Sequence, residues 1–362
     1  MANVFDYLKW RGDLSFSDIR PNEIDAVMLA MVSYLDYESL CGGDIKTLRS
    51  AAEGYCADGD YESVDLGFIM PSGKINRMFC EMAASRRYGG LRISDFEARS
   101  SDEDVYQFGA VTFHMPGKQM MVVFRGTDDS LVGWREDCCL AFLDEIPAQR
   151  MAVEYLERIA DKYPEERIYI TGHSKGGNLA VYSAIKCRGD VKERIARAYC
   201  HDGPGLTRET VDSAAYRLMQ RKLTVLLPQS SFVGTMFEKG EKYIVIKSSA
   251  RGLLQHDPYS WELDGPAFLR LPELSHKGKK NEEQFRAGME RMSAEEKREF
   301  VDTMFSVLAS TGAGTLSELT DGGLKKLITI VKTYGGLDKQ KRELMLALVL
   351  KLFDMKRERP DG

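Results

Sequence analysis

The chain has 362 residues, of which 43% are apolar and 29% charged, and its net charge is −5. A chain of this length can bury a full hydrophobic core, and its mild acidity lacks the basic surface typical of nucleic-acid-binding proteins. No run of roughly 18 uncharged apolar residues is present, and the first residues, MANVFDYLKWRGDLSF, lack the apolar run of a signal peptide. We therefore expect no nucleic-acid partner and no transmembrane segment.

The seven cysteines form no CxxC pair and show no zinc-binding spacing. An odd number of scattered cysteines is typical of reduced, mostly buried thiols in a cytoplasmic protein. The sequence therefore predicts a cytoplasmic location, without a metal ion or another cofactor.

Secondary structure is expected to alternate between strands and helices through most of the chain. Residues 23–35 and 74–87 have the periodicity of amphipathic helices. From residue 105, VYQFGAVTFHM and QMMVVFRGT are predicted strands joined by a turn, and they are followed by helical segments at 133–143 and 147–163. Further strands, RIYITG, IARAYC, KLTVLL and YIVIKSS, are separated by the helix NLAVYSAIKC, by a helix near 208–221 and by a second helical or loop crossover. This order predicts an α/β fold with a mainly parallel sheet and helices on both faces.

The character of the chain changes beyond about residue 270. SHKGKKNEEQ is predicted to be a polar linker, and 282–357 to be three helices broken at 311–312 and 335–336. We expect an α/β domain over 1–270 and a helical appendage over 271–362 that packs on it. The last helix, LMLALVLKLF, is apolar around much of its circumference, so it must pack on the body or on a second copy of the chain, which would give a homo-oligomer. A mobile lid over the catalytic site is the alternative role.

Residues 169–178, YITGHSKGGN, place the pattern Gly-x-Ser-x-Gly between a predicted strand and a predicted helix. A sharp strand-to-helix turn exposes the serine hydroxyl, and the helix N-terminus directs free N–H groups toward a developing oxyanion. The pattern predicts that Ser174 is a nucleophile. A glycine-rich turn without chemistry is the alternative.

A serine nucleophile requires a base within hydrogen-bond distance. The chain has five histidines, and His256 follows the last predicted strand, which is where an α/β hydrolase carries its base. We choose His256 as the base. His201, at the end of the strand after the elbow helix, is the alternative.

The acid that orients this base is harder to assign. Its usual position follows the strand KLTVLL, where this chain has Ser230 and Ser231. Asp202, in the loop CHDGPG, lies at the same predicted sheet edge as the elbow, and we favour it as the acid. Ser231 is the alternative position, and Asp257 is poorly placed because it adjoins the base in sequence.

Two backbone N–H groups are candidates for the oxyanion hole. One belongs to Lys175, directly after the nucleophile, and the other to Thr127, in the FRGT segment after an early strand. The Lys175 side chain either attracts an acidic substrate group or is a solvated side chain at a helix start.

Three segments, FRGT, GHSKGGN and His256–Trp261, together resemble the class-three lipases of fungi and plants. When the segments NVFDYLKWRGDLSF and DGPG are added to these three, the chain more closely resembles an uncharacterised bacterial family of lipase-like α/β hydrolases. This resemblance covers roughly residues 3 to 270. The resemblance implies an acyl-ester hydrolase with Ser174 as nucleophile, His256 as base and Thr127 at the oxyanion hole. The chain departs from the class-three lipases at the acid, where they carry an aspartate and it has two serines.

The sequence thus leaves two hypotheses. The first is a serine hydrolase that cleaves a carboxylic ester or thioester through an acyl-enzyme on Ser174. Its substrate would be a small acyl compound, and lipids belong to this class. The second is a catalytically weak or inactive α/β hydrolase that acts as a binding or scaffold protein, which the departure at the acid would favour.

Overall fold

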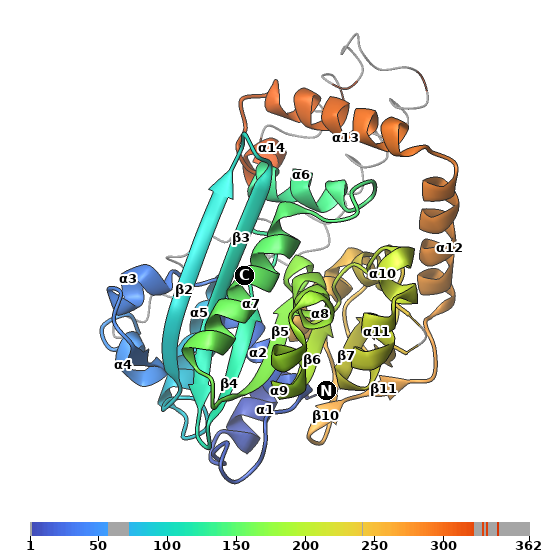
Figure 1. The fold of residues 1–362 in the computed structure, drawn as a ribbon. Coiled ribbons are helices and arrows are strands. Elements are labelled where there is room, and N and C mark those ends of the chain that lie inside the picture. The colour runs from blue at the N-terminus through green and yellow to red at the C-terminus, as the bar shows by residue number, and fades with distance from the viewer. Residues whose placement is uncertain are drawn as a thin grey trace.

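The computed structural model describes residues 2–56, 72–240, 242–321, 328, 331 and 339 (Figure 1). Its centre is a nine-stranded sheet in the order β1-β2-β3-β4-β5-β6-β7-β8-β11. The strands are β1 Lys46–Thr47, β2 Arg92–Ser101, β3 Tyr106–Met115, β4 Gln119–Phe124, β5 Arg167–His173, β6 Ile195–His201, β7 Leu223–Pro228, β8 Ile244–Ile246 and β11 Arg270–Leu271. A separate short hairpin pairs β9 (Leu263–Asp264) with β10 (Ala267–Phe268).

The α/β fold class predicted from the sequence is confirmed. Strands β4 to β8 are parallel, and the helical connections between them supply the crossovers that parallel strands require. Antiparallel strands extend this parallel centre at both ends, because β2, β3 and β4 are joined by tight hairpins and β11 turns back along β8. The sequence did not predict β2, since its second half is polar and largely exposed.

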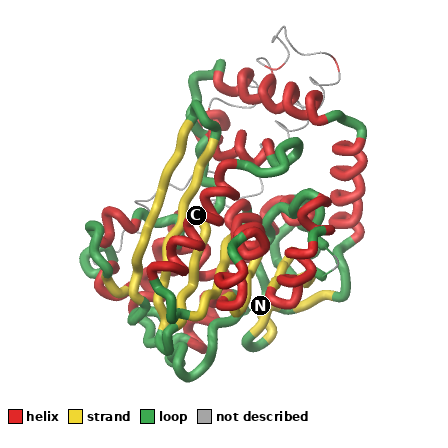
Figure 2. The backbone as a smooth tube through the Cα atoms, viewed as in Figure 1, coloured by secondary structure: helices red, strands yellow, loops and turns green. Residues whose placement is uncertain are grey.

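Helices cover both faces of the sheet, as Figures 1 and 2 show. Their bounds are α1 Val4–Arg11, α2 Glu23–Val32, α3 Tyr37–Cys41, α4 Leu48–Ala52, α5 Ser72–Ala84, α6 Leu131–Cys139, α7 Pro147–Lys162, α8 Lys175–Lys186, α9 Gly189–Arg194, α10 Arg208–Asp212 and α11 Ala214–Met219. The alternation within β4 illustrates the layering: Met121 and Val123 pack with α1, α2 and α5, whereas Met120 and Val122 pack with α7 and α8.

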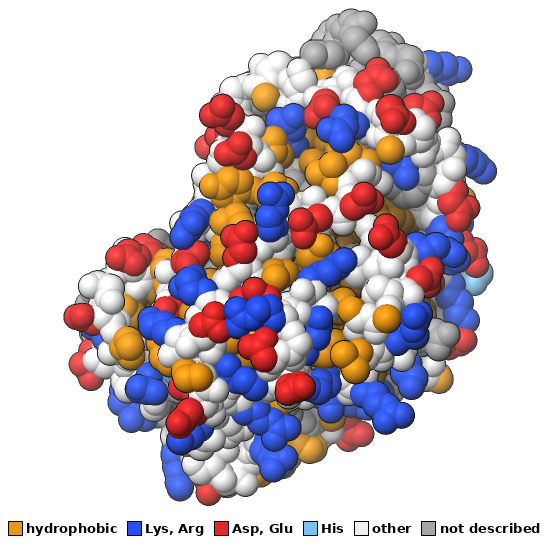
Figure 3. All heavy atoms as spheres, in the orientation of Figure 1, with side chains coloured by type: hydrophobic (Ala, Val, Ile, Leu, Met, Phe, Trp, Pro, Cys, Tyr) orange, Lys and Arg blue, Asp and Glu red, His pale blue; other side chains and the backbone are white. Residues whose placement is uncertain are grey.

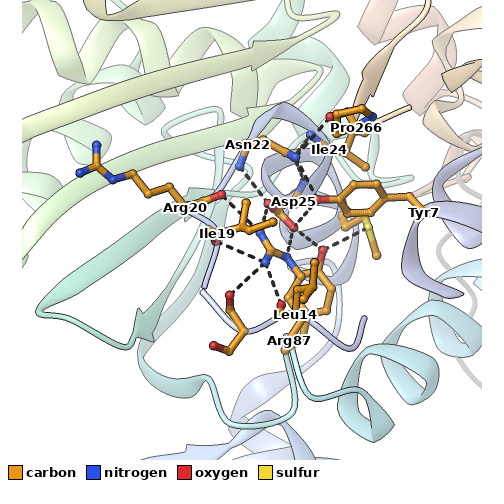
Figure 4. Close-up of polar contacts among 12 residues, drawn as sticks. Tyr7, Leu14, Ile19, Arg20, Asn22, Ile24, Asp25, Arg87 and Pro266 are labelled. Carbon is orange, nitrogen blue, oxygen red and sulfur yellow. Dashed lines mark hydrogen bonds and ion pairs between the residues drawn. The ribbon is translucent and has the colours of Figure 1, made fainter. Parts of the chain in front are cut away.

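A buried ion pair fastens the N-terminal segment to this body (Figure 4). Arg87 donates two hydrogen bonds to the carboxylate of Asp25, at 2.7 and 2.6 Å, and both side chains are almost fully buried. The same guanidinium donates to the backbone carbonyls of Leu14 (2.9 Å) and Ile19 (3.3 Å), so the loop between α1 and α2 closes around it. The planar guanidinium fork suits this arrangement because it satisfies several acceptors at once.

Two cysteines depart from the sequence prediction. Cys56 and Cys80, 24 residues apart, form a disulfide, and five cysteines are free. The expectation of reduced thiols is therefore wrong for this pair, because the fold brings together two side chains whose sequence spacing carries no signal. A disulfide is typical of an oxidising compartment, so the cysteines do not support a cytoplasmic location.

The C-terminal segment begins with α12 (His276–Glu290), where the sequence predicted a polar linker. The linker prediction is wrong because Ser275 caps the helix, accepting a hydrogen bond from the Gly278 N–H, and Lys and Glu are good helix formers. Helices α13 (Ala294–Ala309) and α14 (Leu316–Asp321) follow. Residues 340–362, with the predicted last helix, lie outside the described residues. The domain division at residue 270 stays a prediction.

Helix α13 lies next to α6 near the top of the view in Figure 1 and packs on it. Val301, Met304, Phe305 and Leu308 form an apolar cluster with Leu131 of α6. This contact places α13 against α6.

None of the helices within the described ranges is long and apolar enough to cross a bilayer. On the face drawn in Figure 3, acidic and basic side chains are interspersed without an extended patch of one sign.

Candidate active site

Five loops meet at one edge of the sheet, where β4 to β8 end. They follow Phe124, His173, His201, Pro228 and Ile246. Because parallel strands place their carboxyl ends at the same edge, every residue predicted from the sequence to be catalytic lies in or directly after one of these loops.

Ser174 stands in the turn between β5 and α8. Its backbone has φ 56° and ψ −132°, a conformation that non-glycine residues rarely adopt, and its N–H donates to the His201 carbonyl at 3.0 Å. Such strain concentrates at functional sites, and the Ser174 side chain makes no capping hydrogen bond to the helix it precedes. Among the described residues the Ser174 hydroxyl has no hydrogen-bond partner.

Two neighbouring loops come within contact distance of the Ser174 turn at glycines. A Cβ atom at Gly126, in FRGT, would lie 3.3 Å from the Ser174 Cβ, and one at Gly203, after Asp202, would lie 2.6 Å from the Ser174 carbonyl oxygen. Only glycine allows the second approach without displacement of the elbow, so the FRGT and DGPG motifs supply the space for the turn.

His256 and Asp202 are in direct contact. His256 ends a short 3₁₀ helix after β8 (Gly252–His256), and its Nδ1 lies 2.7 Å from Oδ2 of the fully buried Asp202. Since a carboxylate only accepts, Nδ1 carries a proton, and in the neutral ring Nε2 is then the nitrogen with the free lone pair.

Ser231, the alternative acid position, contacts the aspartate and not the histidine. Its hydroxyl donates to Oδ1 of Asp202 at 2.5 Å and accepts from the Gly234 N–H at 2.9 Å. Both carboxylate oxygens of Asp202 are therefore engaged, one by His256 and the other by Ser231.

His173 and Asn178, which the sequence analysis did not single out, hold these loops in place. Nε2 of His173 donates to the backbone carbonyl of His256 at 2.8 Å. Asn178, in the first turn of α8, donates to the carbonyls of Pro204 and Gly205 in the loop that carries Asp202. Their place inside GHSKGGN is the only local signal of this role. Burial lowers the pKa of His173 well below its ordinary value, so it stays neutral.

His201, the alternative base, lies inside the core. Its ring is fully buried between Tyr199 and Trp261, and neither ring nitrogen has a hydrogen-bond partner among the described residues. Burial lowers the pKa of His201 to about 3, so the side chain is neutral at physiological pH. The position is unsuited to a base that must reach the Ser174 hydroxyl.

The two predicted oxyanion donors are anchored through adjacent residues of α6. The Thr127 hydroxyl donates to Oδ2 of Asp137 at 2.6 Å, and Nζ of Lys175 donates to Oε2 of Glu136 at 2.9 Å. Burial raises the pKa of Asp137 to about 6. The Lys175 side chain is fully buried. Both predicted roles, a solvated side chain and a side chain that attracts an acidic substrate group, are therefore wrong.

No cluster of three or more His, Cys, Asp or Glu side chains suited to a metal ion occurs in the part of the chain that the structure describes.

The sequence pattern of the Mbeg1-like family matches residues 82–306. The chain belongs to the Mbeg1-like family. The matched range contains Thr127, Ser174, Asp202 and His256, so the whole cluster belongs to the part of the chain that defines the family. No curated protein matches the chain.

Several fungal lipases of known structure are similar to this member of the Mbeg1-like family. A lipase from Yarrowia lipolytica is 15% identical over 66% of this chain and 86% of its own, with a TM-score of 0.36. The Rhizomucor miehei lipase propeptide complex is 14% identical over 76% of this chain and 80% of its own, also with a TM-score of 0.36. A triacylglycerol lipase from Penicillium expansum is 10% identical over 51% of this chain and 84% of its own, with a TM-score of 0.32.

Proposed function

We propose that the protein is a serine hydrolase that cleaves a carboxylic ester or thioester through an acyl-enzyme on Ser174. One observation carries the proposal: a buried aspartate orients His256 at the sheet edge where Ser174 stands in a strained strand-to-helix turn. A serine, a base and an orienting acid are the three groups that together activate a hydroxyl for attack on a carbonyl carbon.

In the proposed reaction, the Ser174 oxygen attacks the carbonyl carbon while Nε2 of His256 takes the hydroxyl proton. The carbonyl oxygen becomes an oxyanion, which the N–H groups of Thr127 and Lys175 stabilise. The C–O or C–S bond then breaks, and His256 returns the proton to the leaving alcohol or thiol. Water, activated by the same histidine, attacks the acyl-enzyme and releases the acid. Asp202 holds His256 in the required tautomer throughout and stabilises its protonated form.

The alternative, an inactive binding protein, was favoured by the absence of an aspartate after KLTVLL. Asp202 reaches His256 from the neighbouring strand, at 2.7 Å, so the departure at Ser230 and Ser231 gives the alternative no support.

A fluorophosphonate probe followed by intact-mass analysis tests the proposal. We expect one adduct on the wild-type chain and none on Ser174→Ala. The rate of ester hydrolysis by Ser174→Ala should fall by several orders of magnitude, since loss of the serine lowers kcat by up to about 10⁶ in strong triads. Labelling that survives Ser174→Ala would show that another hydroxyl reacts.

A further inference from the structure

The side chain of Lys175, the residue after the proposed nucleophile, is buried, and its ammonium group bonds within a buried polar cluster. Its ammonium group donates to the Gln107 backbone carbonyl (2.7 Å), the Gln107 side-chain oxygen (2.8 Å) and Glu136 (2.9 Å). All three of its N–H bonds are used. Lys175 and Glu136 are both 0% exposed, so water does not screen the pair.

Both carboxylate oxygens of Glu136 are also engaged. Besides Lys175, its Oε2 accepts from the Gln107 N–H at 3.1 Å, and its Oε1 accepts from the Ala148 N–H at 2.9 Å. One carboxylate thus joins the start of β3, the start of α7 and the start of α8 to helix α6.

A buried ion pair is a costly way to hold a fold together. Two charges lose their hydration, and apolar replacements of similar volume are often equally stable or more so. The energy of the pair alone does not account for this cluster. Its geometry does, because a fully bonded lysine fixes the position of its own backbone, and the backbone N–H of Lys175 is one of the two proposed oxyanion donors.

The second donor is fixed by the next residue of the same helix. Asp137 accepts from the Thr127 hydroxyl at 2.6 Å, and its other oxygen lies 3.8 Å from the Lys175 ammonium. Adjacent carboxylates of α6 therefore hold the two residues whose N–H groups must converge on one oxyanion.

We propose that Glu136 is a positioning residue, which through its buried ion pair with Lys175 sets the distance between the backbone N–H groups of Lys175 and Thr127. This inference rests on the proposed function and deepens it. Glu136 does not touch the substrate; it acts through the backbone of Lys175.

Two variants test the role. Glu136→Asp keeps the charge and shortens its reach by one methylene group. The double variant Glu136→Gln/Lys175→Met removes both charges together, so that neither is left buried alone. Arg135→Gln is the matched control, since Arg135 is the preceding residue of α6 and forms an exposed ion pair with Asp302.

Two readouts separate positioning from stability. We expect both Glu136 variants, at temperatures where circular dichroism shows them folded, to react with the fluorophosphonate 10- to 100-fold more slowly, because loss of one oxyanion donor costs about 10²–10³ and a displaced donor costs less. Hydrogen–deuterium exchange should be faster in the peptides that cover 125–130 and 174–180. Arg135→Gln should match the wild type in both measurements.

A folded Glu136 variant with wild-type exchange in both peptides would overturn the positioning role, whatever its reactivity. A wild-type chain that the probe does not label would refute the proposed function, and the exchange comparison would still decide whether Glu136 positions the two donors.

Discussion

Asp202 occupies a backbone conformation that constrains which residues can replace it. Its φ is 52°, its N–H donates to the Leu226 carbonyl at 2.8 Å, and its side chain is fully buried. Aspartate and asparagine tolerate this left-handed region better than other non-glycine residues. Asparagine is therefore the substitution that changes the chemistry of the position with the least backbone strain.

We expect Asp202→Asn to remain folded and to lose up to about 10⁴-fold in kcat, because the amide favours the wrong tautomer of His256. Steady-state ester hydrolysis and urea unfolding measure the two effects. Asp257→Asn is the control, since Asp257 follows His256 directly and caps the next turn through the Tyr259 N–H. Unchanged turnover in Asp202→Asn would contradict the role of Asp202 as the orienting acid.

His201 should make the protein sensitive to acid. Burial lowers its pKa from 6.5 to about 3, so the unfolded chain binds a proton that the folded chain rejects. The stability contribution of the neutral ring is complete above pH 6.5 and is lost as the pH falls toward 3.

The unfolding free energy of the wild type should fall between pH 7.5 and pH 5, in part because the unfolded His201 gains a proton. In His201→Phe this part is absent, so we expect the fall to be about 2 kcal/mol smaller. Urea unfolding at the two pH values measures this difference. His276→Gln, which changes an exposed histidine at the start of α12, is the control. An equal pH dependence in His201→Phe and wild type would show that His201 is not buried as a neutral ring.

At the scale of elements, the disulfide Cys56–Cys80 ties the segment after α4 to the middle of α5. It closes a loop of 24 residues, for which the chain-entropy model gives a stabilisation of about 3 kcal/mol. We expect a reducing agent to lower the unfolding free energy of the wild type by this amount.

The Cys80→Ser variant should be less stable by a similar amount and should not respond to the reducing agent. Intact-mass analysis under non-reducing conditions gives an independent check, since the bonded form lacks two hydrogens. A wild-type mass with all its thiol hydrogens would rule out the disulfide.

At the scale of the whole molecule, α6 lies between the sheet edge that carries Ser174 and helix α13 of the C-terminal segment. Glu136 and Asp137 anchor the helix to the elbow and the FRGT loop, while Leu131 packs under α13. Helix α6 and the loop before it, in which Asp129 accepts from the Ser317 N–H, therefore connect the C-terminal segment to the proposed oxyanion hole.

We expect Phe305→Ala, in α13, to lower the unfolding free energy by about 3 kcal/mol, because it removes a buried aromatic side chain from this contact. Asp302→Ala is the matched control on the same helix and should cost less than about 1 kcal/mol, since its ion pair with Arg135 is exposed. Urea unfolding measures both. Wild-type stability in Phe305→Ala, with an altered preference for acyl chain length, would instead favour a mobile lid.

Local patterns in the sequence were sufficient for the parallel centre of the sheet and for the strand–turn–helix segment around Ser174. The apolar runs of β3 and β4 and the periodicity of α7 and α8 are properties of short windows, so they can be read without the fold. The strand–turn–helix context of Ser174 is equally local. The position of His256 after the last parallel strand followed from chain order alone.

Tertiary structure decided the rest, because these features join segments far apart in the chain. Asp202 contacts His256 across 54 residues, and Glu136 contacts Lys175 across 39, with no sequence spacing that marks either pair. The burial of Lys175, the disulfide between Cys56 and Cys80, and the pairing of the polar strand β2 depend in the same way on what packs around each residue. A local pattern indicates which face of a helix or strand is apolar. The partner of a buried charge, of a thiol or of an edge strand depends on which distant segments the assembled sheet brings next to it.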